Sequence, residues 1–473
     1  MRKLRYTLAL AFCMLTASAG YAYEVRLQSN CGDGLSYLAF YLGPKLYVED
    51  SAIVKNGIAV FRQDKKLPSG IYSIVFPGKR LTADFLVDKS QNILIKADTA
   101  NLVDMQIIGS PENTPFREYQ KYMSKQGKFL MEERQAYMAS KTKSDSTLHE
   151  EKYRKLSNEL QAYREGLIAK DPKSMLAVLL QAMKEPEFPG KVAKTRQDSI
   201  DNFNYYKAHF WDGISFMDDR IVRTPFFQVK LENYYRNVIY NMPNDTIIKD
   251  IYYKLLLART APEMYKYLLN WLTDEYINPK YMGQDAVFVH LYNQYHSKGL
   301  TPWLSKKQHD AISNRAFMVM GNLVGEPAFN FEMLNQQDKL TYLNDLKADY
   351  TVLIFWDPNC GHCKTEVPRI DSMYRAAWKS HGVKMVAVKT ESSKEEWTKF
   401  IKEHHLEDWV HLYESDAMAE MNKQAQRPGY KQLYDITMTP TIFLLDKDKR
   451  IMAKKLTFEQ INDLLQLKWK KSN

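Results

Sequence analysis

Two of the four cysteines in this chain, Cys360 and Cys363, stand three positions apart within "TVLIFWDPNCGHCKTEVPRI", residues 351–370. An apolar run typical of a buried strand leads into them, and a polar stretch typical of a helix follows. Three chemistries use a cysteine pair of this kind: a structural metal site, a redox-active dithiol and a peroxidatic centre. The remainder of the chain decides among the three.

Neither a metal site nor a peroxidatic centre fits the surrounding sequence. Zinc would need a second pair of ligands at a matching spacing, and His404 and His405 are suggestive only because they are neighbours in the sequence. A peroxiredoxin carries a threonine three residues before its reactive cysteine, whereas this chain has Asp357 there. We therefore expect a redox-active dithiol, with no metal and no cofactor beyond the disulfide that Cys360 and Cys363 can form.

The amino terminus indicates export. Three basic residues at positions 2, 3 and 5 precede a short apolar stretch, and small residues follow up to a cleavage site before Tyr23. This layout predicts a signal peptide over residues 1–22, with an apolar run too short to span a bilayer. A lipoprotein attached through Cys13 is disfavoured because Phe12 stands where a small residue is expected. We expect a protein of the periplasm or cell envelope, with no transmembrane segment in its mature form.

The charge and the remaining cysteine suggest no further chemistry. The formal net charge is +10, and lysines are scattered among acidic residues without a basic block, so we expect no nucleic-acid partner. Removal of the signal peptide leaves Cys31 as the one cysteine outside the pair. We interpret it as an inert buried thiol, because three cysteines are too few for a disulfide-stapled scaffold.

The sequence changes character twice after the signal peptide. Residues 23–108 hold short β-type runs separated by turn residues, which predicts a small antiparallel sandwich-like or barrel domain. Residues 109–321 repeat apolar residues at intervals of three and four, which predicts an all-α domain. Residues 322–473 alternate strand-like and helix-like segments, which predicts an α/β domain with a mixed sheet covered on both faces.

The third region resembles the thioredoxin fold in three motifs. "TVLIFW" runs directly into the cysteine pair at the start of a helix, and Pro368 lies where thioredoxins carry a proline that kinks this helix. "TMTPTIFLLD" supplies Thr439 and Pro440 at the usual place of the superfamily's cis-proline. The lead-in "VGEPAFNFEML" resembles the TlpA/ResA branch of exported thioredoxin-like proteins, and the resemblance implies a thioredoxin fold for residues 322–473.

The whole chain also resembles a known envelope arrangement. In that arrangement a small β domain and a helical domain, both of unknown function, precede a thioredoxin-like domain. "IIGSPENTPF" would end the first domain, and "HFWDGISFMDDRIVRTPFF" and "MGQDAVFVHLYNQY" would belong to the second.

The resemblance implies roles for the residues of the motif. Cys360, at the helix amino terminus, would be the attacking thiolate, and Cys363 would resolve the mixed disulfide. His362 would add positive charge beside the thiolate. If Pro440 is cis, it would place the backbone of Thr439 against the dithiol, where a substrate peptide pairs with it.

One position departs from the family pattern. Thioredoxin has a buried aspartate six residues before its first cysteine, and this chain has Ile354 there. Proton transfer would then fall to Glu366, although a solvated helix glutamate explains that residue equally well. Trp356 and Asp357 would shape the rim of the site, and Trp356 would contact substrate. Asp357 is explained equally simply as a turn residue before Pro358.

The sequence therefore predicts an exported thiol–disulfide oxidoreductase acting on protein thiols and disulfides of the envelope. Resemblance to the TlpA/ResA branch implies a reductant that a membrane electron donor keeps reduced. The Gly-His dipeptide is shared instead with protein disulfide isomerase, whose potential is about −180 mV against about −270 mV for thioredoxin. We favour a reductase, with an oxidant or isomerase as the alternative. A second alternative is an envelope protein that binds a partner or glycan and in which the redox domain is accessory.

Overall fold

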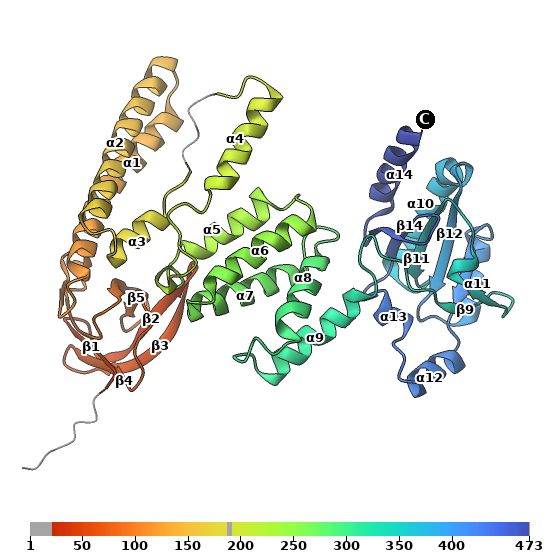
Figure 1. Cartoon of the computed structure of the whole chain (residues 1–473), viewed down its shortest axis with the longest axis horizontal. Coiled ribbons are helices and arrows are strands. Elements are labelled where there is room, and N and C mark those ends of the chain that lie inside the picture. The colour runs from red at the N-terminus through yellow and green to blue at the C-terminus, as the bar shows by residue number, and fades with distance from the viewer. Residues whose placement is uncertain (1–20, 187–191, 473) are drawn as a thin grey trace, which may run out of the picture. The chain divides into compact units, whose positions relative to one another are not determined.

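The computed structural model describes residues 21–186 and 192–472 (Figure 1). All but the last two residues of the expected signal peptide lie outside the described residues, as does Cys13. The chain divides into two compact units, one formed by Met1–Tyr240 with Leu257–Met264 and the other by Asn241–Leu256 with Tyr265–Asn473. None of the helices over the described residues is long and apolar enough to cross a membrane.

The first unit begins with two four-stranded sheets that face each other. Their orders are β4–β1–β7–β8 and β3–β2–β5–β6. The strands are β1 (Tyr23–Ser29), β2 (Gly34–Leu42), β3 (Lys45–Val54), β4 (Ile58–Gln63), β5 (Gly70–Val75), β6 (Thr82–Val87), β7 (Asn92–Ala97) and β8 (Gln106–Ile108). Alternate residues of β1 are buried between the sheets, as the period of a half-buried strand requires. The β region predicted from sequence is therefore confirmed.

One strand pair differs from the expected antiparallel arrangement. β1 pairs with β7 in parallel, while all other pairs of the two sheets are antiparallel. Between β1 and β7 the chain forms β2 and β3 of the second sheet, β4 of the first, and then β5 and β6 of the second. It enters β7 in the same direction as β1. A parallel pair needs a long connection of this kind, so local turn signals could not reveal it.

Helices follow the sandwich within the first unit. They are α1 (Asn113–Ala139), α2 (Lys143–Lys170), α3 (Met175–Ala182), α4 (Arg196–His209) and α5 (Phe227–Asn233), which a π-helical turn extends over Tyr234–Val238. Ile71 and Leu86 point away from the sandwich core and pack against Phe116, Tyr119 and Leu176 of α1 and α3. The helices therefore cover the outer face of β5 and β6.

The helical region continues across the division into the second unit. Its members are α6 (Asn244–Ala258), α7 (Pro262–Ile277), α8 (Asp285–Leu291), a π-helical turn (Tyr292–His296) and α9 (Lys306–Met320). Ser305 caps α9, because its hydroxyl accepts a hydrogen bond from the Gln308 N–H while the Gln308 side chain reaches back.

A seven-stranded mixed sheet organises the rest of the second unit, in the order β10–β9–β13–β12–β11–β14–β15. The strands are β9 (Glu332–Asn335), β10 (Leu340–Tyr342), β11 (Tyr350–Trp356), β12 (Val383–Lys389), β13 (Val410–Tyr413), β14 (Thr441–Leu445) and β15 (Ile451–Lys454). The helices are α10 (Gly361–Met373), α11 (Lys394–Glu403), α12 (Asp416–Gln424), α13 (Tyr430–Leu433) and α14 (Phe458–Ser472). β11, β12 and β13 are parallel, while β14 is antiparallel to β11.

The central strand β11 is buried on both faces. Val352, Ile354 and Trp356 face a core shared with α10, α11 and α14, and Leu353 and Phe355 face a second core that includes α13. Such a strand reads as a continuous apolar run, which is how "TVLIFW" appears in the sequence. The predicted α/β domain with a sheet covered on both faces is confirmed.

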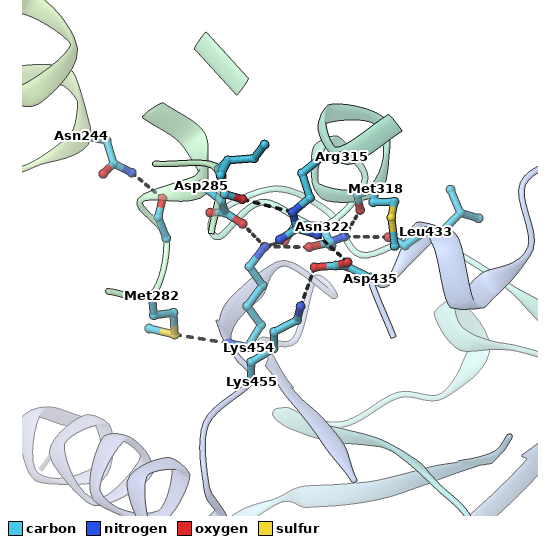
Figure 2. Close-up of polar contacts among 12 residues, drawn as sticks. Asn244, Met282, Asp285, Arg315, Met318, Asn322, Leu433, Asp435, Lys454 and Lys455 are labelled. Atoms are coloured by element: carbon cyan, nitrogen blue, oxygen red, sulfur yellow. Dashed lines mark hydrogen bonds and ion pairs between the residues drawn. The ribbon is translucent and has the colours of Figure 1, made fainter. Parts of the chain in front are cut away.

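Buried polar contacts join this α/β domain to helical residues of the same unit (Figure 2). The Lys454 ammonium at the end of β15 pairs with Asp285 of α8, and both side chains are less than a tenth exposed. The ammonium also donates to the backbone and side-chain oxygens of Asn322, at 2.7 and 2.6 Å. Burial lowers the pKa of Lys454, and Asp285 opposes that shift.

We predict that Asp285→Ala destabilises the second unit. The change leaves a buried ammonium with only the oxygens of Asn322, and breaking a buried ion pair costs about 3–5 kcal/mol. Urea unfolding of the full chain measures the loss. The matched control is Asp310→Ala, which removes the exposed Lys306–Asp310 pair on α9 and should cost about 0.5 kcal/mol or less. Equal losses for the two variants would contradict the prediction.

Candidate active site

Cys360 lies at the junction between β11 and α10. β11 ends at Trp356, a turn follows in which the Cys360 N–H donates to the Asp357 carbonyl at 3.1 Å, and Cys360 is the N-cap of α10. The first N–H groups of a helix have no partner within the helix, and the helix dipole adds positive potential there. The thiol therefore sits where a negative charge is stabilised.

Cys363 lies one turn further along α10 and faces the core. Its side chain is fully buried in the cluster that contains Val367 and Ile370, whereas Cys360 is half-buried at the surface. Both cysteines are free thiols in this structure. Residues three apart on a helix share a face, so the two sulfurs are neighbours that experience different surroundings.

These surroundings shift the two pKa values in opposite directions. Burial raises the pKa of the Cys363 thiol to about 12, although a backbone hydrogen bond with Asp357 opposes the shift. Partial burial also opposes ionisation of Cys360, but hydrogen bonds with Thr439, with the Cys363 backbone and thiol, and with the His362 backbone outweigh it. The pKa of Cys360 is consequently lowered.

The loop between α13 and β14 approaches Cys360 from the opposite side. Its carbonyl at Thr439 lies 3.3 Å from the Cys360 sulfur, and the Thr439–Pro440 peptide bond is cis. The structure thus brings together the cysteine pair and the Thr-Pro dipeptide that the sequence places 79 residues later.

Two cavities flank the Thr437–Thr439 segment of this loop. One of about 400 Å³ opens on the Cys360 side and is lined by polar groups, among them Asp357, Asn359 and Lys431. The other, of about 440 Å³, has a more apolar wall that includes Pro440, Ile442, Leu456 and Phe458. Met438 is 71% exposed and borders both cavities. A polar surface therefore lies on one side of this loop and a more apolar surface on the other.

His362 and Glu366 both line the more apolar cavity. His362 is exposed, and Glu366 makes an ion pair with Arg369 at 2.7 Å on the surface of α10. Ile354, at the position of thioredoxin's aspartate, is fully buried in the core beneath Cys363. Glu366 is thus the carboxylate on α10 that borders the site, in a partly exposed position.

Trp356 does not reach the surface of the site, contrary to its expected contact with substrate. Its side chain is fully buried, and its ring packs 5.2 Å from that of Phe400 on α11. The physical reason is the alternation of β11, which sends Trp356 to the same face as Val352 and Ile354. Trp356 therefore supports the site from beneath.

Asp357 is part of the site framework, which sequence reasoning only partly anticipated. Its buried carboxylate accepts hydrogen bonds from the backbone N–H groups of Asn359, Glu391 and Ser392, at 2.8, 2.9 and 2.6 Å. The first of these is a local Asx-type turn that an Asp-Pro sequence favours. The other two tie the turn before Cys360 to the loop after β12, and no local pattern signals them.

No group of three or more His, Cys, Asp or Glu residues that could hold a metal ion occurs in the part of the chain that the structure describes. His404 instead lies against the ring of Phe400, at the end of α11. The arrangement at Cys360 is suited to thiol–disulfide exchange, in which a thiolate attacks a disulfide sulfur and a second thiol displaces the product.

Comparisons with known proteins agree with this chemistry. The family model described as AhpC/TSA family matches residues 324–454. Thiol-disulfide oxidoreductase ResA of Bacillus cereus is 28% identical over 146 residues, which are 30% of this chain and 77% of that protein. A ResA of Bacillus thuringiensis is 27% identical over 145 residues, covering 30% and 76% of the two chains.

Solved structures also match. A domain of a possible thiol-disulfide isomerase from Cytophaga hutchinsonii is 33% identical and covers 32% of this chain and 95% of its own, with a TM-score of 0.28. A thioredoxin-like protein from Bacteroides caccae is 18% identical and covers 60% of this chain and 99% of its own, with a TM-score of 0.46.

The matched region holds β11, the cysteine pair at the start of α10, and the Thr439–Pro440 loop whose carbonyl contacts Cys360. Residues 324–454 therefore form a thioredoxin-like domain that matches the AhpC/TSA family model, and this chain is a thiol–disulfide oxidoreductase.

Proposed function

We propose that this chain is an exported enzyme that reduces disulfides in proteins of the cell envelope, with Cys360 as nucleophile and Cys363 as resolving thiol. The observation that carries the proposal is the contrast between the two thiols: Cys360 is accessible with a lowered pKa, and Cys363 is buried with a raised one. A thiolate is the attacking species in exchange, so this contrast favours attack by Cys360.

The reaction proceeds in two exchanges. The Cys360 thiolate attacks a substrate disulfide, forms a mixed disulfide and releases the first substrate cysteine as a thiolate, which takes up a proton. Cys363 then loses its proton and attacks the Cys360 sulfur, releasing the second substrate cysteine as a thiolate, which also takes up a proton. The substrate has gained two electrons and two protons, and the enzyme holds the Cys360–Cys363 disulfide. No cofactor beyond this disulfide takes part.

Groups around the cysteines have supporting roles in the proposal. The Thr439 backbone and Pro440 receive the substrate peptide, and the two cavities beside them receive the side chains next to the substrate cysteine. His362 lowers the cost of a thiolate at Cys360, and Glu366 is the candidate acceptor of the Cys363 proton. A membrane electron donor would return the enzyme to the dithiol form.

Direct peroxidase chemistry is not part of the proposal. Asp357 occupies the position of the peroxiredoxin threonine, and three backbone N–H groups engage its carboxylate. It therefore cannot supply the hydroxyl that a threonine offers.

We predict that Cys363→Ala accumulates mixed disulfides with substrate proteins, because Cys360 can attack but nothing resolves the product. Cys360→Ala should lose both turnover and trapping. Non-reducing electrophoresis of the full chain, expressed in the organism's envelope or mixed with oxidised substrate proteins, measures the complexes. Cys31→Ala serves as the control and should leave turnover unchanged. Equal trapping by the Cys360→Ala chain would assign the nucleophile to another residue.

We predict that alkylation of Cys360 has an apparent pKa below that of an ordinary cysteine, about 8.5. The rate of reaction with iodoacetamide should rise with pH to a plateau, with its midpoint below that value, because the hydrogen bonds at Cys360 favour the thiolate. The measurement uses a Cys31→Ala background, so that Cys360 is the accessible thiol that reacts. Adding Cys363→Ala removes a thiol donor and should shift the midpoint upward. An unchanged midpoint would remove that hydrogen bond from the explanation.

We predict a reduction potential between about −270 and −180 mV, the values of thioredoxin and protein disulfide isomerase. A titration of the full chain in glutathione buffers measures it. His362→Pro should lower the potential by some tens of millivolts, because loss of a group that favours the thiolate destabilises the reduced form. A wild-type value near about −120 mV, the potential of DsbA, would make the enzyme an oxidant.

A further inference from the structure

The loop that carries Thr439 is anchored at its start by a buried carboxylate. Asp435 lies two residues after the end of α13, adopts a positive φ of 51° and is 1% exposed. Arg315 of α9 donates from Nη1 to Asp435 Oδ1 at 2.6 Å, and the Lys455 ammonium donates to Oδ2 at 2.5 Å (Figure 2). The Nε of Arg315 also donates to the Ile277 carbonyl at the end of α7, at 3.1 Å. Helical residues therefore hold the first fixed point of the loop.

A second contact fastens the same end of the loop. The Asn322 side chain, fully buried after α9, donates to the Leu433 carbonyl at 2.9 Å and to the Met318 carbonyl at 2.7 Å. Its own oxygens accept from Lys454. A side chain at Gly321 would meet the Leu433 carbonyl at 3.2 Å, so α9 and α13 approach closely here. A single amide thus connects the Lys454–Asp285 pair to the start of the loop.

Only four residues separate this anchor from the reacting sulfur. A chain of four residues spans at most about 14 Å, and its end at Thr439 lies 3.3 Å from the Cys360 sulfur. Between them Thr437 and Met438 are exposed, and the Met438 carbonyl accepts a hydrogen bond from Thr441 Oγ1 at 2.6 Å. The position of Asp435 therefore limits where the Thr439 carbonyl can lie.

The same carboxylate reaches the opposite wall of the apolar cavity. Lys455, its second partner, donates its backbone N–H to the Ile442 carbonyl at 2.8 Å. Lys455 and Leu456 line the cavity that contains His362 and Pro440, and also a separate cavity of about 290 Å³ beside Arg315 and Asp285. Asp435 thus links the loop on one side of the substrate cavity to the Lys455–Leu456 turn on the other.

We propose that Arg315, a residue of the helical region, is a positioning residue for the reaction of Cys360 with protein substrates. It acts through Asp435, which fixes both the Thr439 loop and the Lys455–Leu456 turn. Through Asp435, Arg315 therefore holds the two walls of the substrate cavity at a set separation without lining that cavity itself. This inference rests on the proposed function, in which Cys360 attacks a disulfide while the peptide lies against Thr439.

The test compares two disulfides of different size on the full chain. One is a peptide disulfide, which needs the loop and the cavity walls, and the other is dithiodipyridine, which needs only the thiolate. Arg315→Met should raise the KM for the peptide roughly tenfold, with kcat changed much less, and should leave the rate with dithiodipyridine within about twofold of wild type. Thermal unfolding run in parallel identifies the temperature range in which the variant is folded.

Two further variants keep the test decisive if Arg315→Met folds poorly. Arg315→Lys keeps a positive charge beside Asp435 and should bring the KM for the peptide most of the way back to the wild-type value. Asp435→Asn keeps the shape of the anchor but loses its charge, and should reproduce the effect of Arg315→Met. Lys306→Met, at an exposed position on the same helix, is the control and should change neither rate.

The outcomes separate this inference from the proposed function. A loss that is equal for the peptide and for dithiodipyridine, or no loss with either, in folded Arg315 variants would overturn the positioning role alone. A wild-type chain that reacts with dithiodipyridine but reduces no peptide disulfide would overturn the proposed function and the inference together.

Discussion

A cysteine at the N-cap of a helix and a second one a turn later cannot share one environment. Cys360 meets solvent and backbone N–H groups that have no partner within the helix, while Cys363 is carried into the core by the 3.6-residue period of α10. The rest of the α/β domain maintains this geometry. The central strand β11 ends directly before the turn that leads to Cys360. The Asp357 carboxylate fixes this turn, because it accepts hydrogen bonds from backbone N–H groups of the loop after β12. Exchange needs one thiol that attacks first and a second thiol that attacks later. The positions of the two cysteines along α10 therefore determine which of them attacks first.

The burial that keeps Cys363 from attacking first also makes its thiol harder to deprotonate. The pKa of about 12 means that the thiol must give up a proton before it can attack, and the core beneath it offers Ile354 where thioredoxin has a carboxylate. In the dithiol state the neighbouring sulfur of Cys360 is one partner of the Cys363 thiol, beside the Asp357 backbone. That sulfur ceases to be a thiolate once the mixed disulfide forms. Resolution is then the step that needs a base from outside the core, and in the mechanism that we propose the candidate is Glu366, which lines the more apolar cavity.

Sequence patterns predicted those features that depend on local periodicity. The all-apolar β11, the cysteine pair at the start of a helix and the three regions of different secondary structure all follow from spacing. The burial of Trp356 was within reach, because its alternation with Ile354 assigns it to the core side, but the resemblance to other sites favoured the rim. The Lys454–Asp285 and Arg315–Asp435 contacts join residues 169 and 120 positions apart. Such pairs have no local sequence pattern, because a lysine or aspartate that forms a buried ion pair cannot be distinguished in the sequence from an exposed one.

These buried charges explain why helical residues and the α/β domain contact each other in one defined position. An apolar contact of the same size would tolerate sliding, whereas Asp435 must meet both Arg315 and Lys455 and Lys454 must meet both Asp285 and Asn322. A displaced contact would leave a buried charge without its partner, which costs several kcal/mol. The contact therefore has one relative position. Asp435 takes part in this contact and also lies at the start of the loop beside Cys360. The cavity beside Thr439 has walls that belong to separate loops, and the contact of Asp435 with Lys455 joins these loops to each other.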